Sequence, residues 1–584
     1  MPLLAVLNSR ARLEELIAAG EGIGAVATRT TEVVDGAREH GLQCVHSDDL
    51  STVAEQVAES DHVHRLGIAL AGDEVPAPDD VQRLMWWAIE HPLKCVLAAG
   101  YRTRRLIEAG LDLCDGASGI VHDTEGWIQG GVTVLAAKTL GLPVVGLPPG
   151  PSVTMHRPQD IMVCPGTDVG DGVRTQWRGV ATLEDGRRTI AVMHTNEIAQ
   201  LLRVLMRAGE RWLSFAMDAR EPWRNWEKVD LRPGAFLGAA PEEGAPLAPL
   251  VEPVWPLAAD FPCLSWEREV AELMFVTFQP WVREEAAFAA AAYTAGHVTT
   301  WFGGGDMEPH IRARIAACRA LGIPTLLIQL GAIGDLRLRI HHFADESAMW
   351  SRTAAEDVRA SGCRRPPHVV GWPQGALHLG KGRRPSRTME LPDAWVVLTT
   401  SPADTEGDSY RAGEVFLRDA LRAIREVAPR RARIVVKIHP AQDLESVRTF
   451  CVAQGFPEVT IAEGVDPWGL LPGMTMVLAA PSTAVLTAVR LGLPVVMYHP
   501  WPHPTFYGRF REVPVARTYK ELLYGLRRKL KSTGTDRVAD YARVDTDVVR
   551  RVLAVLRRTT DRGAKLFPSP PPLKSEQSRA DTRP

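Results

Sequence analysis

The sequence lacks the features that mark a secreted or a metal-binding protein. Only eight of its 584 residues are cysteine, no two of them form a CxxC pair, and no cysteine–histidine cluster has zinc-ligand spacing. No run of about 18 residues is apolar and free of charges, which argues against a membrane-spanning helix. The opening residues, MPLLAVLN, lack the basic segment of a signal peptide. We therefore expect a cytoplasmic protein without disulfides, bound metal or transmembrane segment.

A strong excess of charge is also missing. The formal net charge is −3 at pH 7, so no overall basic field attracts nucleic acid or an anionic membrane. A local basic patch is compatible with this total, and peripheral contact with a membrane stays open. Hydrophobic residues make up 45% of the chain, which is typical of soluble globular proteins.

The chain is too long for a single core, and its pattern predicts several α/β units. Short apolar runs alternate with amphipathic stretches, which favours parallel sheets covered by helices. Residues 1–160 are predicted to form an N-terminal α/β domain, with strands at 3–7, 23–27, 95–99 and 143–147. Residues 161–187 are predicted to be a hairpin or linker, because Glu184-Asp185-Gly186 separates two β-prone runs.

Two further α/β units follow in the sequence. The second covers residues 188–375 and contains an insertion at 219–262 that is rich in Pro, Trp and Gly. The third covers 376–560 and ends in a closing C-terminal helix. Residues 561–584 are predicted to be a disordered tail. Strands of the third unit are expected at 395–399, 434–438, 459–462, 476–479 and 495–498.

Polar side chains follow the strands of the third unit. Ligands of an open parallel sheet bind beyond the carboxyl ends of its strands. These positions carry hydroxyls, imidazoles and carboxylates that can line a nucleotide or donor pocket: Thr400, Ser401, Glu463, Asp466 and His499. Asp466, followed by a proline, is equally typical of a helix N-cap.

Two neighbouring segments together indicate a phosphate site. Ser482 and Thr483 open a helix, whose exposed N–H groups attract anions. Lys437 and His439 lie two residues apart at a strand end, so their side chains share one face. Each segment alone has a simpler explanation, since Ser482 can merely cap its helix and His439 can be an ordinary loop histidine.

These motifs resemble a known family. The segments 437–440 (KIHP), 481–483 (PST) and 491–496 (LGLPVV) resemble the donor domain of GT-B glycosyltransferases of the capsule and surface-polysaccharide group. That group includes CMP-sugar transferases and wall glycerophosphotransferases. Residues 316–331, 343–345 and 369–373 resemble the preceding domain of the same family. The resemblance is strong over 315–373 and 434–500.

The resemblance implies both a fold and an activity. The fold is a GT-B-like pair of Rossmann-type domains facing a cleft, here preceded by an additional N-terminal α/β domain. The activity is metal-independent transfer from a nucleotide-activated sugar to a glycan or lipid-linked glycan acceptor, with no cofactor beyond that co-substrate. In the family the His and Ser/Thr contact the donor phosphate, which implies this role for His439, Ser482 and Thr483 here, beside Lys437.

Two departures from the family pattern keep alternatives open. Thr487 stands where many GT-B enzymes have an acid that binds the ribose, and Leu330 stands where the family's Q-H-G has histidine. A nucleotide-sugar 2-epimerase-like isomerase shares the fold but needs carboxylates in the cleft, so Thr487 counts against it. A non-catalytic nucleotide- or glycan-binding homologue is the third alternative.

A general base for transfer is expected on the acceptor-side domain. The best candidates are Asp306 and Glu308, in a glycine-rich loop between a strand and a helix. The simpler explanation is an acidic first helical turn, which the helix dipole favours. His194, at the end of the first strand of this domain, is the alternative base. The sequence does not name the donor base, the sugar, the acceptor or the stereochemistry.

Overall fold

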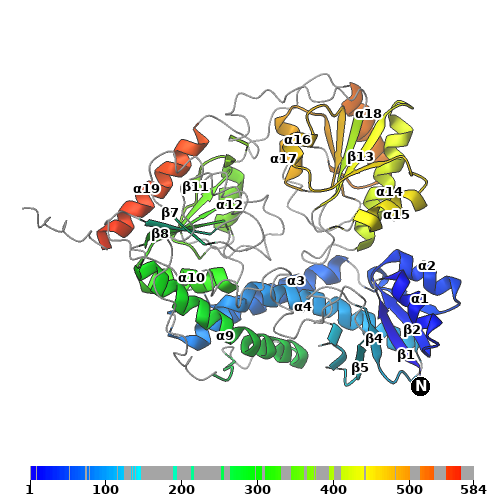
Figure 1. Ribbon diagram of the computed structural model, residues 1–584, viewed down its shortest axis with the longest axis horizontal. Helices are drawn as coiled ribbons and strands as arrows, with labels where there is room; N and C mark the ends of the chain where they lie inside the picture. Colours follow the sequence, from blue (N-terminus) through cyan, green and yellow to red (C-terminus); the bar gives the residue numbers. More distant parts are fainter. Residues whose placement is uncertain are drawn as a thin grey trace, which may run out of the picture.

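The computed structural model describes the chain over ten ranges, with short gaps inside several of them: residues 2–146, 189–193, 212–215, 251–255, 263–329, 343–376, 394–399, 410–499, 513–531 and 547–566. Three parallel sheets lie within these ranges, each flanked by helices (Figure 1). The expected pair of Rossmann-type domains preceded by a further α/β domain is confirmed. The cleft expected between the pair stays a prediction. None of the helices in these ranges is long and apolar enough to cross a membrane.

The N-terminal sheet has the strand order β3-β2-β1-β4-β5. Its strands are short apolar runs bounded by turns: β1 (Leu3–Leu7), β2 (Ile23–Thr28), β3 (Gln43–His46), β4 (Ile120–His122) and β5 (Val144–Gly146). Helices α1 (Arg10–Ala18) and α2 (Thr31–Glu39) connect the first three strands. Because β1 lies in the middle of the sheet, its residues Leu4, Ala5 and Leu7 are completely buried.

Two long helices interrupt the N-terminal sheet between β3 and β4. They are α3 (Val53–Ala71) and α4 (Val81–Leu113), which pack against each other. The strand predicted at 95–99 is wrong, because these residues lie inside α4. A helix that is buried around most of its circumference loses its amphipathic period, so part of it reads as a short apolar strand.

The second sheet has the order β11-β10-β9-β8-β6-β7. All of its neighbouring strands are parallel: β6 (Thr189–Met193), β7 (Trp212–Phe215), β8 (Val298–Gly303), β9 (Thr325–Ile328), β10 (Glu346–Met349) and β11 (His368–Val369). Helices α9 (Ser265–Ala295), α10 (Pro309–Ala320) and α12 (Arg352–Ala360) belong to this unit. The hairpin expected at 161–187 and most of the insertion expected at 219–262 lie outside the described residues.

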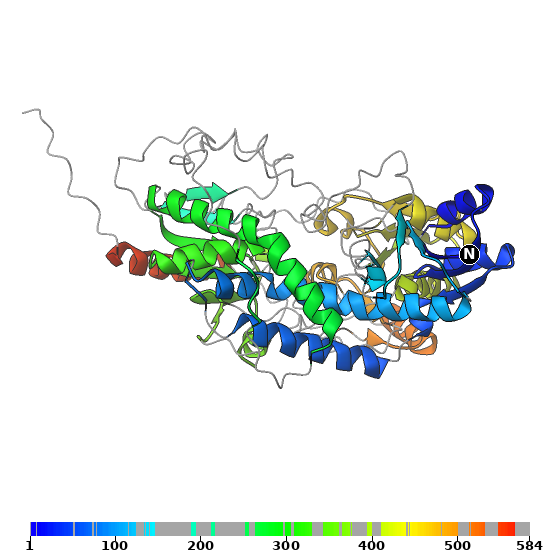
Figure 2. The same ribbon diagram turned by 90° about the horizontal axis from the view of Figure 1, so that it is seen from below.

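The expected boundary at residue 160 does not separate two cores. One hydrophobic cluster joins α3 and the first half of α4 with α9, α10 and β8. The second half of α4 instead packs Leu106 and Ile107 against β1 and β2. Figure 2 shows α4 running from the N-terminal sheet to the second unit beside α9. The N-terminal unit is therefore joined to the second unit through a continuous helix.

A buried charged cluster reinforces this junction. Glu90 of α4 accepts a hydrogen bond of 2.7 Å from Arg312 of α10 and also pairs with Lys94. All three side chains are at most 2% exposed. The Arg312 guanidinium additionally lies over the ring of Phe343, 4.9 Å from its centroid. A buried pair of this kind is costly to break, because the remaining charge has no water to solvate it.

The third sheet has the order β14-β13-β12-β15-β16-β17. The five strands expected here are confirmed as β12 (Ala394–Leu398), β13 (Arg433–Lys437), β14 (Thr460–Ala462), β15 (Met476–Ala479) and β16 (Val495–Tyr498), and β17 (Val515–Ala516) adds an edge. One face is covered by α14 (Tyr410–Val427), α15 (Leu444–Ala453) and α18 (Tyr519–Lys531). The other face packs against α17 (Ala484–Arg490) and α12.

The closing helix, α19 (Val548–Leu566), lies on the second sheet, where it contacts β8, β9 and β10. Its inward side chains are buried: Val548, Val552, Val555 and Leu556. The assignment of residues up to 560 to the donor domain is therefore wrong for this helix, and residues 561–566 are helical rather than part of a disordered tail. The amphipathic pattern predicts a buried face but does not say which sheet buries it.

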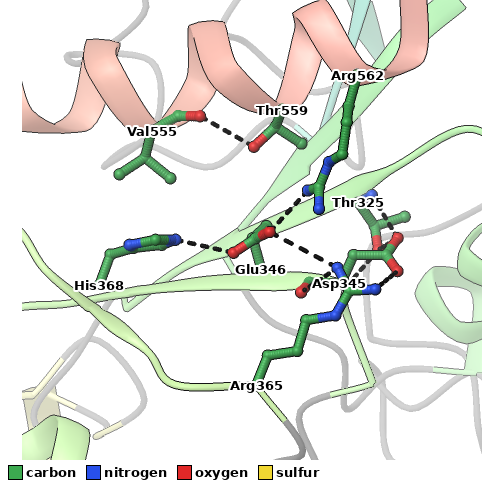
Figure 3. Close-up of polar contacts among 8 residues, drawn as sticks. All are labelled: Thr325, Asp345, Glu346, Arg365, His368, Val555, Thr559 and Arg562. Atoms are coloured by element: carbon green, nitrogen blue, oxygen red, sulfur yellow. Dashed lines mark hydrogen bonds and ion pairs between the residues drawn. The ribbon is translucent and has the colours of Figure 1, made fainter.

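Polar contacts at the edge of the second sheet hold the end of α19 (Figure 3). Glu346, at the start of β10, accepts hydrogen bonds of 2.7 Å from Arg562 and 2.8 Å from His368. Burial by itself would raise the pKa of Glu346, but the hydrogen bonds from His368 and Arg562 outweigh it and hold that pKa low. Beside it, Asp345 accepts hydrogen bonds from the backbone N–H and hydroxyl of Thr325.

Candidate functional site

The third sheet has the strand order 3-2-1-4-5-6 of a Rossmann fold. In such a sheet the strand order reverses between the first and fourth strands, here β12 and β15, and ligands bind beyond the carboxyl ends at that point. The residues at and just after the carboxyl ends of β12, β15 and the neighbouring β13 are therefore the candidate ligand contacts. They include Lys437, His439 and Ser482 among the predicted residues.

The end of β13 is held in place by a hydrogen-bonded turn. The backbone N–H of His439 donates to the hydroxyl of Thr399 at 3.1 Å and to the side-chain oxygen of Gln442 at 2.9 Å. The Thr399 hydroxyl also contacts Gln442 and lies 3.2 Å from the carbonyl oxygen of Lys437. These contacts join the ends of β12 and β13, so the half-buried His439 has a defined position.

Lys437 and His439 lie close enough to influence each other. Burial lowers the pKa of Lys437, an effect that the nearby carboxylate of Asp466 opposes. Burial also lowers the pKa of His439, and the charge of Lys437 lowers it further. The predicted convergence of the ammonium and the imidazole is consistent with this coupling. An anion placed between them would stabilise the charged form of both groups.

Ser482 and Thr483 precede α17. The hydroxyl oxygen of Ser482 is buried and has no hydrogen-bond partner within the ranges that the structure describes. The N-cap of α17 is Thr483, and its side chain makes no capping hydrogen bond. The simpler explanation for Ser482, that it caps its own helix, is therefore absent from the structure. A buried hydroxyl without a partner requires another explanation, such as a ligand that supplies one.

The strand register brings the two segments to the same level. Leu398 of β12 pairs with Lys437 on one side and with Ala479 on the other. Neighbouring strands lie about 4.8 Å apart, so the end of β13 is roughly 10 Å from the end of β15. Lys437 and Ser482 thus flank the switch point at one edge of the sheet.

The other predicted pocket residues have different environments. Asp466 is exposed and caps α16 (Pro467–Leu470) by accepting a hydrogen bond of 3.1 Å from the N–H of Trp468. The N-cap role that the sequence left open for Asp466 is therefore confirmed. Glu463 is exposed as well. His499 is only 6% exposed, and its backbone N–H bonds to Ala516. Thr487, which departs from the GT-B pattern in the sequence, is 3% exposed within α17.

Several predicted residues lie outside the described part of the chain: Thr400, Ser401, His194, Asp306, Glu308 and Leu330. The strands that precede the three candidate bases are described, however. His194 directly follows β6, and Asp306 and Glu308 follow β8. Strands β6 and β8 pair directly, at the point where the order of the second sheet switches. The candidate bases thus follow neighbouring strands at a ligand-binding position of this fold.

Sequence reasoning missed two features of the site. Thr399 and Gln442 organise the turn at His439, although the two are 43 residues apart in the chain. In addition, three tryptophans form a row: Trp372 lies 5.7 Å from Trp350 and 5.6 Å from Trp468, between ring centroids. Trp350 and Trp372 follow strands of the second sheet, whereas Trp468 lies in α16. This row joins the second and third units, and no local sequence signal predicts it.

No group of three or more His, Cys, Asp or Glu side chains in the described ranges is arranged to hold a metal ion. No protein-family profile matches the chain, and no curated protein sequence matches it. Solved structures do show similarity to it. They include UDP-GlcNAc 2-epimerase of Methanocaldococcus jannaschii (12% identity, TM-score 0.43, 64% of this chain and 99% of that one).

Two further structures show a similar level of likeness. MnaA of S. aureus, solved with UDP, has 10% identity and a TM-score of 0.44, over 64% of this chain and 97% of that one. The wall teichoic acid polymerase TagF has 8% identity and a TM-score of 0.35, over 65% of this chain and 91% of that one. Similarity at this level does not assign an activity.

Proposed function

We propose that the chain is a metal-independent glycosyltransferase that uses a nucleotide-activated sugar, in surface polysaccharide biosynthesis. The donor phosphates bind at the switch point of the third sheet, between Lys437 with His439 and Ser482 with Thr483. The observation that carries this proposal is the buried Ser482 hydroxyl, which has no hydrogen-bond partner among the described residues and lies beside the point where a Rossmann-type sheet binds its ligand.

The physical chemistry of the site favours a phosphate. A buried hydroxyl without a hydrogen bond costs about 1–3 kcal/mol, and a phosphate oxygen removes this cost. Lys437 supplies positive charge from the other side of the switch point. Burial lowers the pKa of both Lys437 and His439, so the charged form of each side chain is disfavoured in the free protein. A bound phosphate would favour the charged form of both groups through charge-assisted hydrogen bonds, without any metal.

The acceptor is a glycan or lipid-linked glycan that enters from the side of the second sheet. An inverting transfer needs a base beside the acceptor hydroxyl. We assign this role to Asp306 or Glu308, which follow β8, with His194 after β6 as the alternative. The pairing of β6 with β8 supports this assignment, because it brings the starts of both loops together.

A panel of nucleotide sugars tests the proposal directly. The purified protein is incubated with CMP-, CDP-, UDP- and GDP-sugars, and its melting temperature and the products are measured. We expect one nucleotide to stabilise the wild type and to lose this effect in His439→Ala and Ser482→Ala. Slow release of free sugar, unchanged by EDTA, supports a metal-independent transferase. Formation of an epimeric nucleotide sugar would replace it by the isomerase, and no response to any nucleotide would refute both.

A further inference from the structure

A basic surface lies on the third unit, on the face away from α17. Helices α14 and α18 contact each other and cover the same face of the sheet. Their outer side chains, with those of the turn that leads from α14 into β13, include many exposed bases: Arg422, Arg425, Arg430, Arg431, Arg433, Lys520, Arg527 and Arg528. The exposed acids on the same elements are Glu426 and Glu521. We call this set of residues the basic face.

The acidic side chains near this surface already accept hydrogen bonds or form ion pairs. Glu426 accepts from Arg527 at 2.7 Å and from the hydroxyl of Tyr519 at 3.2 Å. The carboxylate of Glu521 accepts from the backbone N–H of Arg517. Arg425 pairs with Glu458, beyond α15. Six bases have no acidic partner within the part of the chain that the structure describes: Arg422, Arg430, Arg431, Arg433, Lys520 and Arg528.

This concentration of charge contrasts with the rest of the protein. The whole chain has a formal net charge of −3, so the residues outside the basic face carry a net negative charge. The basic face therefore carries a local excess of positive charge that attracts a negatively charged partner.

The shape of the surface selects among negatively charged partners. Both helices return from the carboxyl edge of the sheet to its amino edge, so they run side by side in the same direction. Two adjacent parallel helices present a broad surface, whereas a DNA groove accepts a single protruding helix or a β-ribbon. Single-strand binders interleave several aromatic side chains with their bases, but the only large exposed aromatic on these described helices is Tyr524.

We infer that the basic face binds the surface of an anionic phospholipid bilayer. Its Lys and Arg side chains contact lipid phosphates, and Tyr524, which is 67% exposed, lies at headgroup level. Leu522 and Leu526 of α18 are completely buried against the sheet, so they are not free to insert into lipid. The attachment is consequently electrostatic and reversible. It does not depend on the proposed transferase activity.

Co-sedimentation with vesicles tests this inference on the full chain. The probes are vesicles of phosphatidylcholine alone and of phosphatidylcholine mixed with phosphatidylglycerol. We expect binding only to the mixed vesicles, with loss of binding as the salt concentration rises. The triple variant Arg422→Gln, Arg430→Gln, Arg528→Gln removes three unpaired charges and should weaken binding roughly 10–100-fold.

A matched control removes the same charge elsewhere. Arg83, Arg319 and Arg359 are exposed and belong to other helices, α4, α10 and α12. Their replacement by Gln should leave vesicle binding within about twofold of the wild type. Melting temperatures of both triple variants identify any that fail to fold, and Lys520→Gln with Arg431→Gln then serves as a second test. Equal binding by both sets of variants, binding to phosphatidylcholine alone, or binding to duplex RNA but not to vesicles would overturn the inference.

Discussion

Replacing Ser482 by alanine should change stability and ligand binding in opposite directions. The Ser482 hydroxyl is buried and finds no hydrogen-bond partner in the described part of the chain. Such a group contributes a desolvation cost of about 1–3 kcal/mol that nothing in the free protein offsets. Ser482→Ala removes this cost and leaves only a small cavity. We therefore expect the free protein to become more stable by about 1 kcal/mol.

The same substitution should weaken the binding of the donor. A hydrogen bond from a hydroxyl to a charged phosphate contributes about 1.5–3 kcal/mol. Its loss corresponds to a roughly 10- to 100-fold higher dissociation constant for the nucleotide that stabilises the wild type. Urea unfolding without nucleotide and isothermal titration with nucleotide measure the two effects separately.

Ser351 offers the matched control, because it is a buried serine whose hydroxyl is used. It is 1% exposed, and its Oγ accepts from the backbone N–H of Ala354 at 3.0 Å, at the start of α12. Ser351→Ala should therefore destabilise the protein by about 1 kcal/mol and leave nucleotide affinity unchanged. If Ser482→Ala destabilises the free protein as Ser351→Ala does, the hydroxyl has a partner and the reasoning is refuted.

Four further predictions concern charge. Glu346→Gln should destabilise the protein by about 1–2 kcal/mol and speed hydrogen exchange in α19, because it weakens two charge-assisted hydrogen bonds to partly exposed partners. The control Arg365→Gln changes an exposed residue and should have little effect. Equal hydrogen exchange of α19 in the two variants would contradict this prediction. Because its pKa is lower in the folded protein, the ionised Glu346 stabilises the fold at a pH above its unfolded-state pKa. The wild type should lose this stabilisation as the pH falls through the lowered folded-state pKa, whereas Glu346→Gln should not. Nucleotide affinity should rise as the pH falls towards the lowered pKa of His439 and should level off below that pKa, because the phosphate favours the imidazolium. Calorimetry that shows no such rise would exclude His439 from the phosphate site. Glu90→Gln should cost about 3–5 kcal/mol in urea unfolding, since Arg312 and Lys94 remain buried without their counter-charge, and a loss below about 1 kcal/mol would show that water reaches them.

The third sheet was the most predictable part of the fold. Its central strands are buried on both faces, so they appear in the sequence as short runs of Val, Ile and Leu between Gly and Pro. The run at 95–99 has the same local composition but lies in α4. What distinguishes the two cases is the environment: α4 packs against the N-terminal sheet at one end and against α9 and α10 at the other. No window of a few residues contains that information.

Some residues of the candidate site could likewise be predicted from the sequence, whereas others could not. Lys437, His439 and Ser482 could be named because parallel strands with intervening helices place their following residues at one edge. Thr399 and Gln442 could not be named, because their contacts with His439 depend on the register between β12 and β13. That the Ser482 hydroxyl has no partner among the described residues is likewise a property of the packed structure.

By itself, the sequence determined the α/β class, the strands of the third unit and the residues that follow them, because hydrophobic periodicity and chain direction act over short distances. Only the tertiary structure decided that α4 joins the N-terminal sheet to the second unit, that α19 returns to the second sheet, and that bases on α14 and α18 form one surface. These are contacts between residues far apart in the chain. Their partners are selected by packing and burial across the whole molecule, which no local pattern encodes.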